Sequence, residues 1–178
     1  MALELIDLDG NVRREMLAEL DRDLASGLLY YGHSLSVLGR ELYPTLLREA
    51  MIDGTDELLA EALSTPGLFE TYYERPNPTG GSSRTKVPVT APLALAEAEF
   101  NRFYLRGLCR HLLYLEAGVI EIYRARPASP ARPESEAMIG RQLDPEVLLA
   151  ALREHIGVDT ALGLPRGPSS GLSGRFAR

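Results

Sequence analysis

The chain has 178 residues, of which 45% are hydrophobic and 25% are charged, so its composition is that of a globular protein and excludes a fibrous or disordered one. The net charge of −6 and the pI near 5.2 argue against nucleic acid as a partner, because nucleic-acid-binding domains are usually basic. With Cys109 as its single cysteine, the chain has no intramolecular disulfide framework.

The first residues, MALELIDLDGNVRREML, carry acids early and lack the basic region and apolar run of a secretory signal. No apolar stretch approaches the roughly 18 residues that a membrane-spanning helix needs. The sequence therefore predicts a cytoplasmic protein, or one incorporated in a particle assembled in the cytoplasm, with no membrane partner.

Three amphipathic helices are predicted in the first third of the chain. The first covers residues 11–27, where apolar residues recur at helical spacing and a glycine follows the last turn. The second begins after Ser34 or Ser36 as N-cap, and Pro44 either kinks it or divides it into two short helices. Thr55 opens a short third helix.

Residues 68–92 differ in character, with four prolines, a Gly-Gly pair and a cluster of aromatic residues. The runs FETYYER and RTKVPVT favour strands on either side of a turn-rich tip, which predicts a β-hairpin. Connections this long are uncommon and are usually functional or disordered. We therefore expect a protruding hairpin that contacts a neighbouring subunit through Tyr72 and Tyr73.

The longest helix is predicted over residues 93–116, and most of the core should pack against it. Gly107 within this helix should let another element approach closely. A strand is predicted at residues 119–125 and needs a partner. The hairpin at residues 68–90 is the obvious candidate, so the expected sheet is small and antiparallel.

The C-terminal part begins with an extended, proline-rich connector. It leads to a helix bounded by Asp144 as N-cap, Pro145 in the first turn and Gly157 after the last. Residues 158–178 show no period and hold several glycines and prolines, yet they contain apolar side chains. They are predicted to be an extended arm that contacts neighbours through four residues. These are Leu162, Leu164, Leu172 and Phe176.

Together these elements predict an α+β fold that is mostly α. About five helices surround the long central helix, beside a small antiparallel sheet made of the hairpin and one strand. Residues 1–157 are predicted to form a single globular domain with the hairpin protruding at residues 68–92. The C-terminal arm follows at residues 158–178.

No pattern in the sequence fixes a catalytic chemistry. The stretch GPSSG at residues 167–171 matches G-x-S-x-G, but it follows all three histidines, whereas a nucleophile elbow precedes its acid and histidine. His33, His111 and His155 lie in separate elements, without a second ligand at metal spacing. The sequence predicts no catalytic residue, no metal and no cofactor.

Arg102, Arg106 and Arg110 recur at steps of four in the longest helix. Like charges at this spacing repel one another, so other groups should face them. Carboxylates of the same chain, such as Glu99 or acids of the first or last helix, are one possibility. A subunit interface and a phosphate backbone are the others. The negative net charge favours carboxylates, in this subunit or in the next.

We therefore predict a non-enzymatic structural or assembly subunit of a homo-oligomer, such as a ring, a shell or a virion- or phage-like particle. Its loop and tail would contact neighbouring copies or other protein subunits. An alternative is an enzyme or a nucleic-acid-processing component with a dispersed site around Glu97, Glu99 and the arginine row.

Overall fold

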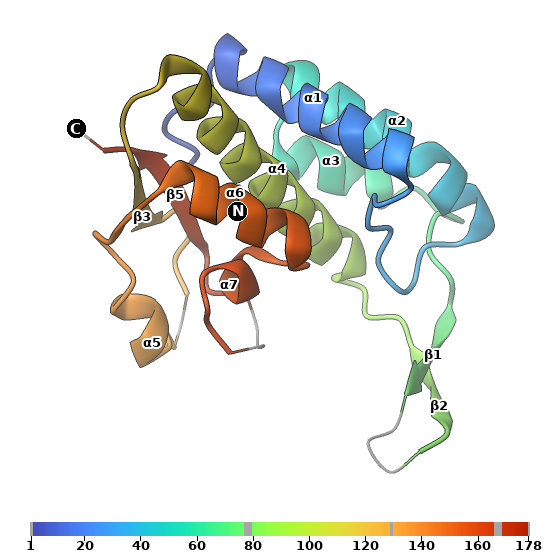
Figure 1. Ribbon diagram of the computed structural model, residues 1–178. Helices are drawn as coiled ribbons and strands as arrows, with labels where there is room; N and C mark the ends of the chain where they lie inside the picture. The colour runs from blue at the N-terminus through green and yellow to red at the C-terminus, as the bar shows by residue number, and fades with distance from the viewer. Residues whose placement is uncertain (1, 77–79, 129, 166–168, 178) are drawn as a thin grey trace. The chain divides into compact units, whose positions relative to one another are not determined.

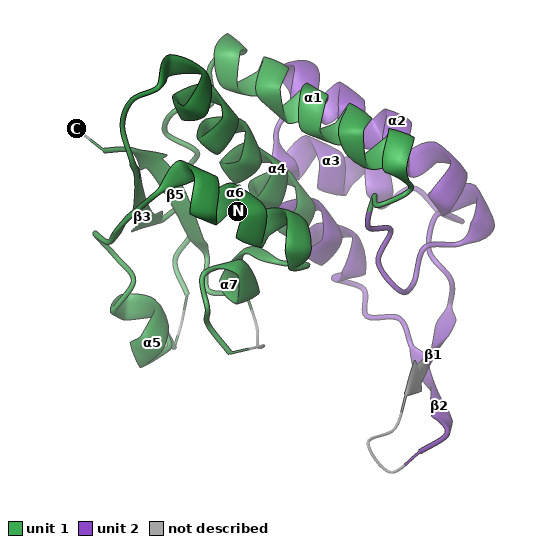
Figure 2. Ribbon diagram, viewed as in Figure 1, with its two compact units in different colours: residues 1–29, 98–178 green, residues 30–97 purple. Residues whose placement is uncertain are grey.

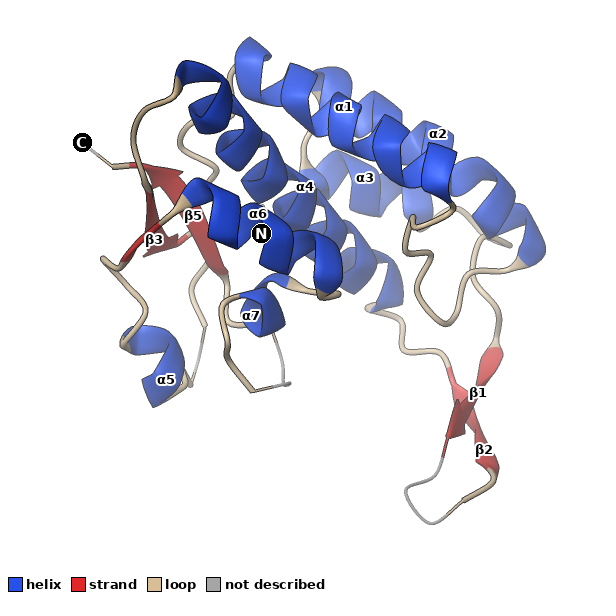
Figure 3. Cartoon of the chain, viewed as in Figure 1, coloured by secondary structure: helices blue, strands red, loops and turns tan. Residues whose placement is uncertain are grey.

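The computed structural model describes residues 2–76, 80–128, 130–165 and 169–177 (Figure 1). Within these residues the chain forms seven helices and two small antiparallel sheets and is about half helical (Figure 3). This confirms the predicted α+β, mostly α fold. The tip of the predicted hairpin and part of the predicted C-terminal arm lie outside the described residues.

The chain divides into two compact units (Figure 2). Unit 1 contains residues 1–29 and 98–178, and unit 2 contains residues 30–97. The long helix α4, Ala91–Leu115, contributes its first residues to unit 2 and the others to unit 1. The extent of a single domain over residues 1–157 stays a prediction.

The helices of unit 2 begin where the sequence places their caps. The hydroxyl of Ser36 accepts a hydrogen bond from the N–H of Gly39 at 2.9 Å and starts α2, Val37–Asp53, which continues through Pro44 as one helix. Thr55 caps α3, Asp56–Leu63, in the same way. The buried apolar side chains of this unit include Tyr43, Leu47, Met51, Leu59, Leu63 and Leu68.

Unit 2 also carries the predicted hairpin. Strands β1, Tyr72–Pro76, and β2, Ser82–Lys86, pair in antiparallel register with Tyr72 opposite Lys86. Their sheet has two strands, and no third strand joins it among the described residues. The prediction that the hairpin pairs with the strand at residues 119–125 is therefore wrong.

Unit 1 is built on two helices that pack closely. Helix α1, Gly10–Ser26, is capped by Asp9, whose carboxylate accepts hydrogen bonds from two backbone N–H groups at 2.9 Å, and it ends at a glycine with φ of 67°. A Cβ on Gly107 of α4 would lie 2.8 Å from the carbonyl oxygen of Val12 and from Cγ of Met16. Gly107 therefore allows α1 to lie directly on α4.

The second sheet belongs to unit 1. Strand β3, Ile120–Arg124, lies between β4, Gln142–Leu143, and β5, Leu172–Phe176, and both pairings are antiparallel. The predicted strand is confirmed, but its partners come from the connector and the C-terminal residues.

Three further helices complete unit 1. Helix α6, Pro145–Glu154, begins at the predicted cap Asp144 and ends two residues before the predicted boundary, with His155 as C-cap. The short helices α5, Pro133–Glu136, and α7, Val158–Ala161, lie in segments that were expected to be extended.

The C-terminal residues form a strand of unit 1 instead of the predicted extended arm. The side chain of Asn101 on α4 donates to the carbonyl oxygen of Leu172 at 2.8 Å and accepts a hydrogen bond from the hydroxyl of Ser173 at 2.6 Å. A Cβ on Gly174 would lie 2.5 Å from Cγ2 of Ile120, so this glycine lets β5 approach its neighbours. Composition alone does not reveal contacts that come from residues so distant in the chain.

We expect Gly107→Ala to lower the free energy of unfolding by about 1 to 3 kcal/mol, because the added methyl group forces α1 away from α4. Urea unfolding followed by circular dichroism measures this change. The control is Gly10→Ala at the start of α1, where a Cβ meets nothing within 4 Å and the change should be neutral. Equal stabilities of the two variants would contradict the close packing at Gly107.

Candidate functional site

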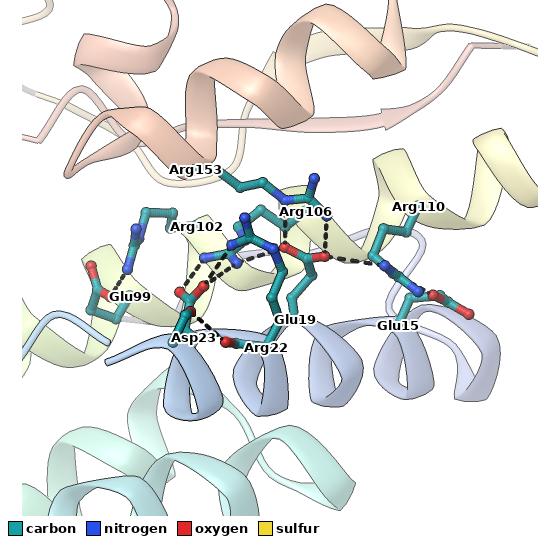
Figure 4. Close-up of polar contacts among 10 residues, drawn as sticks. Glu15, Glu19, Arg22, Asp23, Glu99, Arg102, Arg106, Arg110 and Arg153 are labelled. Carbon is teal, nitrogen blue, oxygen red and sulfur yellow. Dashed lines mark hydrogen bonds and ion pairs between the residues drawn. The ribbon is translucent and has the colours of Figure 1, made fainter. Parts of the chain in front are cut away.

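Two members of the arginine row of α4, Arg106 and Arg110, face a row of acids on α1 (Figure 4). Glu15, Glu19 and Asp23 also recur at steps of four, so each helix carries its charges along one stripe. The two helices run in opposite directions, because the later acids meet the earlier arginines. We define the acid–arginine cluster as these acids together with the arginines that bind them, which are Arg22, Arg106, Arg110 and Arg153.

Arg106 is the centre of this cluster and is fully buried. Its Nη1 and Nη2 donate to the two carboxylate oxygens of Asp23 at 2.7 and 2.8 Å, and its Nε donates to Glu19 at 2.8 Å. Burial disfavours the charged guanidinium, but the hydrogen bonds and charges of both acids outweigh it and raise the pKa of Arg106. The buried cation is therefore held by two carboxylates.

Glu19 accepts hydrogen bonds from three arginines. Besides Arg106, Arg153 of α6 donates through Nε at 3.0 Å and Nη2 at 2.6 Å, and Arg110 donates through Nη1 at 3.3 Å. Burial favours the protonated acid, but the hydrogen bond from Arg153 and the charge of Arg106 lower the pKa of Glu19 to about 2. One carboxylate thus joins α1, α4 and α6.

Arg110 lies at the edge of the cluster. Its Nε donates to Glu15 at 2.7 Å, and 36% of its side chain is exposed. The hydrogen bond to Glu15 raises the pKa of Arg110. Solvent screens this pair, so it contributes less than the buried pairs.

Arg102 pairs with Glu99 on its own helix, at 2.5 Å, and both side chains are buried. Oε1 of Glu99 and Nε of Arg102 have no hydrogen-bond partner in the described part of the chain. Burial is the largest influence on Glu99 and raises its pKa despite the charge of Arg102. This pair is less well satisfied than the acid–arginine cluster.

The three predicted arginines therefore face carboxylates of the same chain. Arg102 and Arg106 are buried, and Arg110 is the member of the row that reaches solvent. Glu99 was named from the sequence as a partner, whereas the acids of α1 were expected only as a group, without their residue numbers. Their spacing of four residues, equal to that of the arginines, was the signal available in the sequence.

The predicted contact residues of the hairpin remain at the surface. Tyr72 is 44% exposed, and the guanidinium carbon of Arg84 lies 4.5 Å from its ring centroid. Tyr73 is half-buried and alternates with Tyr72 along β1, so the two rings belong to opposite faces of the hairpin.

The predicted contact residues of the C-terminal segment lie mostly inside unit 1. Leu162, Leu164 and Leu172 are buried. Phe176 is half-buried, with its ring centroid 5.7 Å from that of His111. These four residues cover the chain's own core, which removes the reason to expect an arm there.

A shallow depression of about 180 Å³ lies between α2 and α3. Its lining combines apolar side chains with the carboxylates of two exposed residues, Glu49 and Asp53. The apolar residues of the lining are Leu46, Ala50, Leu58, Leu59 and Ala62.

Within the described residues, no group of three or more His, Cys, Asp or Glu side chains is placed to hold a metal ion. Burial raises the pKa of the Cys109 thiol, which keeps it in the unreactive protonated form. The described helices include none that is long and apolar enough to cross a bilayer.

No protein-family model, no curated protein and no solved structure matches this chain.

We expect Arg106→Met to lower the free energy of unfolding by about 3 to 5 kcal/mol, because it leaves Asp23 and Glu19 buried with less compensation. Arg110→Met is the matched control, and its partly exposed pair should cost about 1 kcal/mol or less. Urea unfolding of both variants measures the difference. Similar losses at the two positions would show that Arg106 is not the centre of the cluster.

Acid should destabilise the protein through Glu19. Because the pKa of Glu19 is about 2 in the folded chain and its ordinary value is 4.5, its stabilisation is complete above pH 4.5. It is lost as the pH falls through 2, and it amounts to about 3 kcal/mol. Glu19→Gln should flatten the decline of unfolding free energy between pH 5 and 2, measured by urea titration at each pH.

Glu99→Gln is a control of opposite sign in that titration. The raised pKa of Glu99 makes its contribution most favourable at low pH, and this contribution is lost as the pH rises. Glu99→Gln should therefore gain stability relative to the wild type with increasing pH. If the unfolding free energy of Glu19→Gln fell between pH 5 and 2 as steeply as that of the wild type, Glu19 would not be the cause of the acid destabilisation.

Proposed function

We propose that this chain is a non-enzymatic assembly subunit of a homo-oligomer, such as a ring or a shell, and that its hairpin contacts a neighbouring copy. The observation that carries the proposal is the two-stranded β1–β2 sheet. It is joined by no third strand among the described residues.

The contacts within a two-stranded hairpin stabilise it only slightly. Isolated two-stranded hairpins are marginally stable in water, and further strands or a packed face are needed for independent stability. Every residue of β2 except Thr85 is exposed, and Tyr72 presents an aromatic ring to solvent. Contact with another subunit would supply the missing layer.

The C-terminal residues 158–178 are not part of the proposed contact. Residues 172–176 pair with β3 and are part of unit 1, so the hairpin is the remaining candidate arm. Because no third strand joins this sheet among the described residues, the outer edges of β1 and β2 are open to pairing with another chain.

The alternative function, a dispersed catalytic or nucleic-acid site, has less support. Arg106 and Arg110 donate to carboxylates of α1, so a phosphate group would have to displace these acids. Glu99 and Arg102, with one unpartnered atom each, are the observation that favours this alternative.

We expect the wild type to have a native mass of at least twice the 19.6 kDa of one chain. Replacing residues 74–84 by Asn-Gly joins Tyr73 to its partner Thr85 through a two-residue turn and removes the hairpin's outer part. This variant should shift to the mass of one chain while it keeps its helical circular dichroism. Light scattering coupled to gel filtration measures both masses.

Two outcomes of this experiment would count against the proposal. A wild type that stays at the mass of one chain over a wide concentration range is no homo-oligomer. A shortened variant with the wild-type mass assembles without its hairpin.

A further inference from the structure

We propose that the hairpin of one copy docks on the α2–α3 face of a second copy, over the depression between these helices. This inference rests on the proposed homo-oligomer and names the surface that receives the hairpin. We use hairpin for residues 71–76 and 80–87 and α2–α3 face for the exposed side chains of residues 37–64.

The hairpin is basic although the chain is acidic. In the sequence, residues 71–76 and 80–87 contain three basic residues, Arg75, Arg84 and Lys86, and one acid, Glu74, which gives a net charge of +2. The chain as a whole has a net charge of −6. The rest of a second copy is therefore negatively charged and can attract the positively charged hairpin.

The α2–α3 face carries the opposite charge. Its exposed charged side chains are five acids and one arginine, a net charge of −4, and α3 has no basic residue. Glu49 and Asp53 line the depression, and neither side chain has a hydrogen bond or ion pair among the described residues. These two carboxylates are available to Arg84 and Lys86 of another copy.

The two surfaces also match in their apolar parts. Leu58 in the depression is 55% exposed, and Ile52, which precedes Asp53 in the sequence, is 53% exposed. Tyr72 on the hairpin is 44% exposed, with Arg84 over its ring. An aromatic ring beside an arginine is a frequent anchor at protein interfaces, and apolar residues with flanking carboxylates suit it.

The proposed contact joins the hairpin of one copy to the α2–α3 face of another copy. These are two different surfaces, and both belong to unit 2. Figure 1 shows β1 and β2 extending away from α2 and α3 within unit 2, so each copy presents the hairpin and the face separately. A contact of this type is heterologous, and its repetition produces a closed ring or an open filament. It is thus consistent with a ring or a shell built from one chain.

Charge reversal on each surface tests the docking. Arg84→Glu with Lys86→Glu makes the hairpin acidic, and Glu49→Arg with Asp53→Arg makes the depression basic. We expect each double variant alone to self-associate at least tenfold more weakly than the wild type, because like charges then meet. A mixture of the two double variants should regain association, since each hairpin then meets a face of opposite charge. Sedimentation velocity measures all four samples.

A matched control keeps the charge change but moves it to unit 1. Glu116→Arg with Glu154→Arg alters two exposed acids and should leave the wild-type mass unchanged. Circular dichroism checks that every variant keeps its helices.

The outcomes separate this inference from the proposed function. A wild type that remains a single chain refutes the homo-oligomer itself. An assembling wild type whose double variants assemble equally well refutes the docking but leaves the homo-oligomer intact. Loss of association in both variants without recovery in the mixture also refutes the docking, because a direct contact requires recovery.

Discussion

The packing of the helices of unit 1 depends on the hydrogen bonds and ion pairs that Arg106 and Arg153 make with the carboxylate of Glu19. Removing these charges from water is costly, and the cost is offset when each donor and acceptor finds its partner with good geometry. Because the bonds join α1, α4 and α6, a shift of any of these helices leaves a buried charge with fewer partners. The cluster therefore selects one arrangement of three helices more strongly than apolar packing alone would.

Helix α4 connects this cluster with the sheet of unit 1. Arg106 binds the acids of α1, and Asn101, five residues earlier, binds the backbone of β5. Gly107 allows α1 to lie close to α4, which brings the acids of α1 within hydrogen-bonding distance of Arg106. The arginine row, which first suggested an interface, is thus mostly used inside the chain, and the hairpin is left as the surface best suited to a partner.

The sequence predicted the elements that depend on local signals. Thr55 and Asp144 were identified as caps and Ser36 as one of two candidates, because a cap is a contact between residues two or three positions apart. The strand Leu172–Phe176 was missed, since a short segment with a central glycine has no clear period and its burial is provided by Asn101 and β3. The candidate site was half predicted: the arginines were recognised, and their individual partners on α1 were not.

The discontinuity of unit 1 has a consequence for the order of folding. Unit 2 is one continuous segment, whereas the bonds from Arg106 to Glu19 and Asp23 join residues that are 87 and 83 positions apart. During synthesis all of residues 30–97 are added before the arginines of α4 and α6 that bind the acids of α1. The loop-closure entropy of unit 1 is lost afterwards, when α4 and α6 arrive. The residues of unit 2 are therefore all present in the chain before the acids of α1 gain their buried partners.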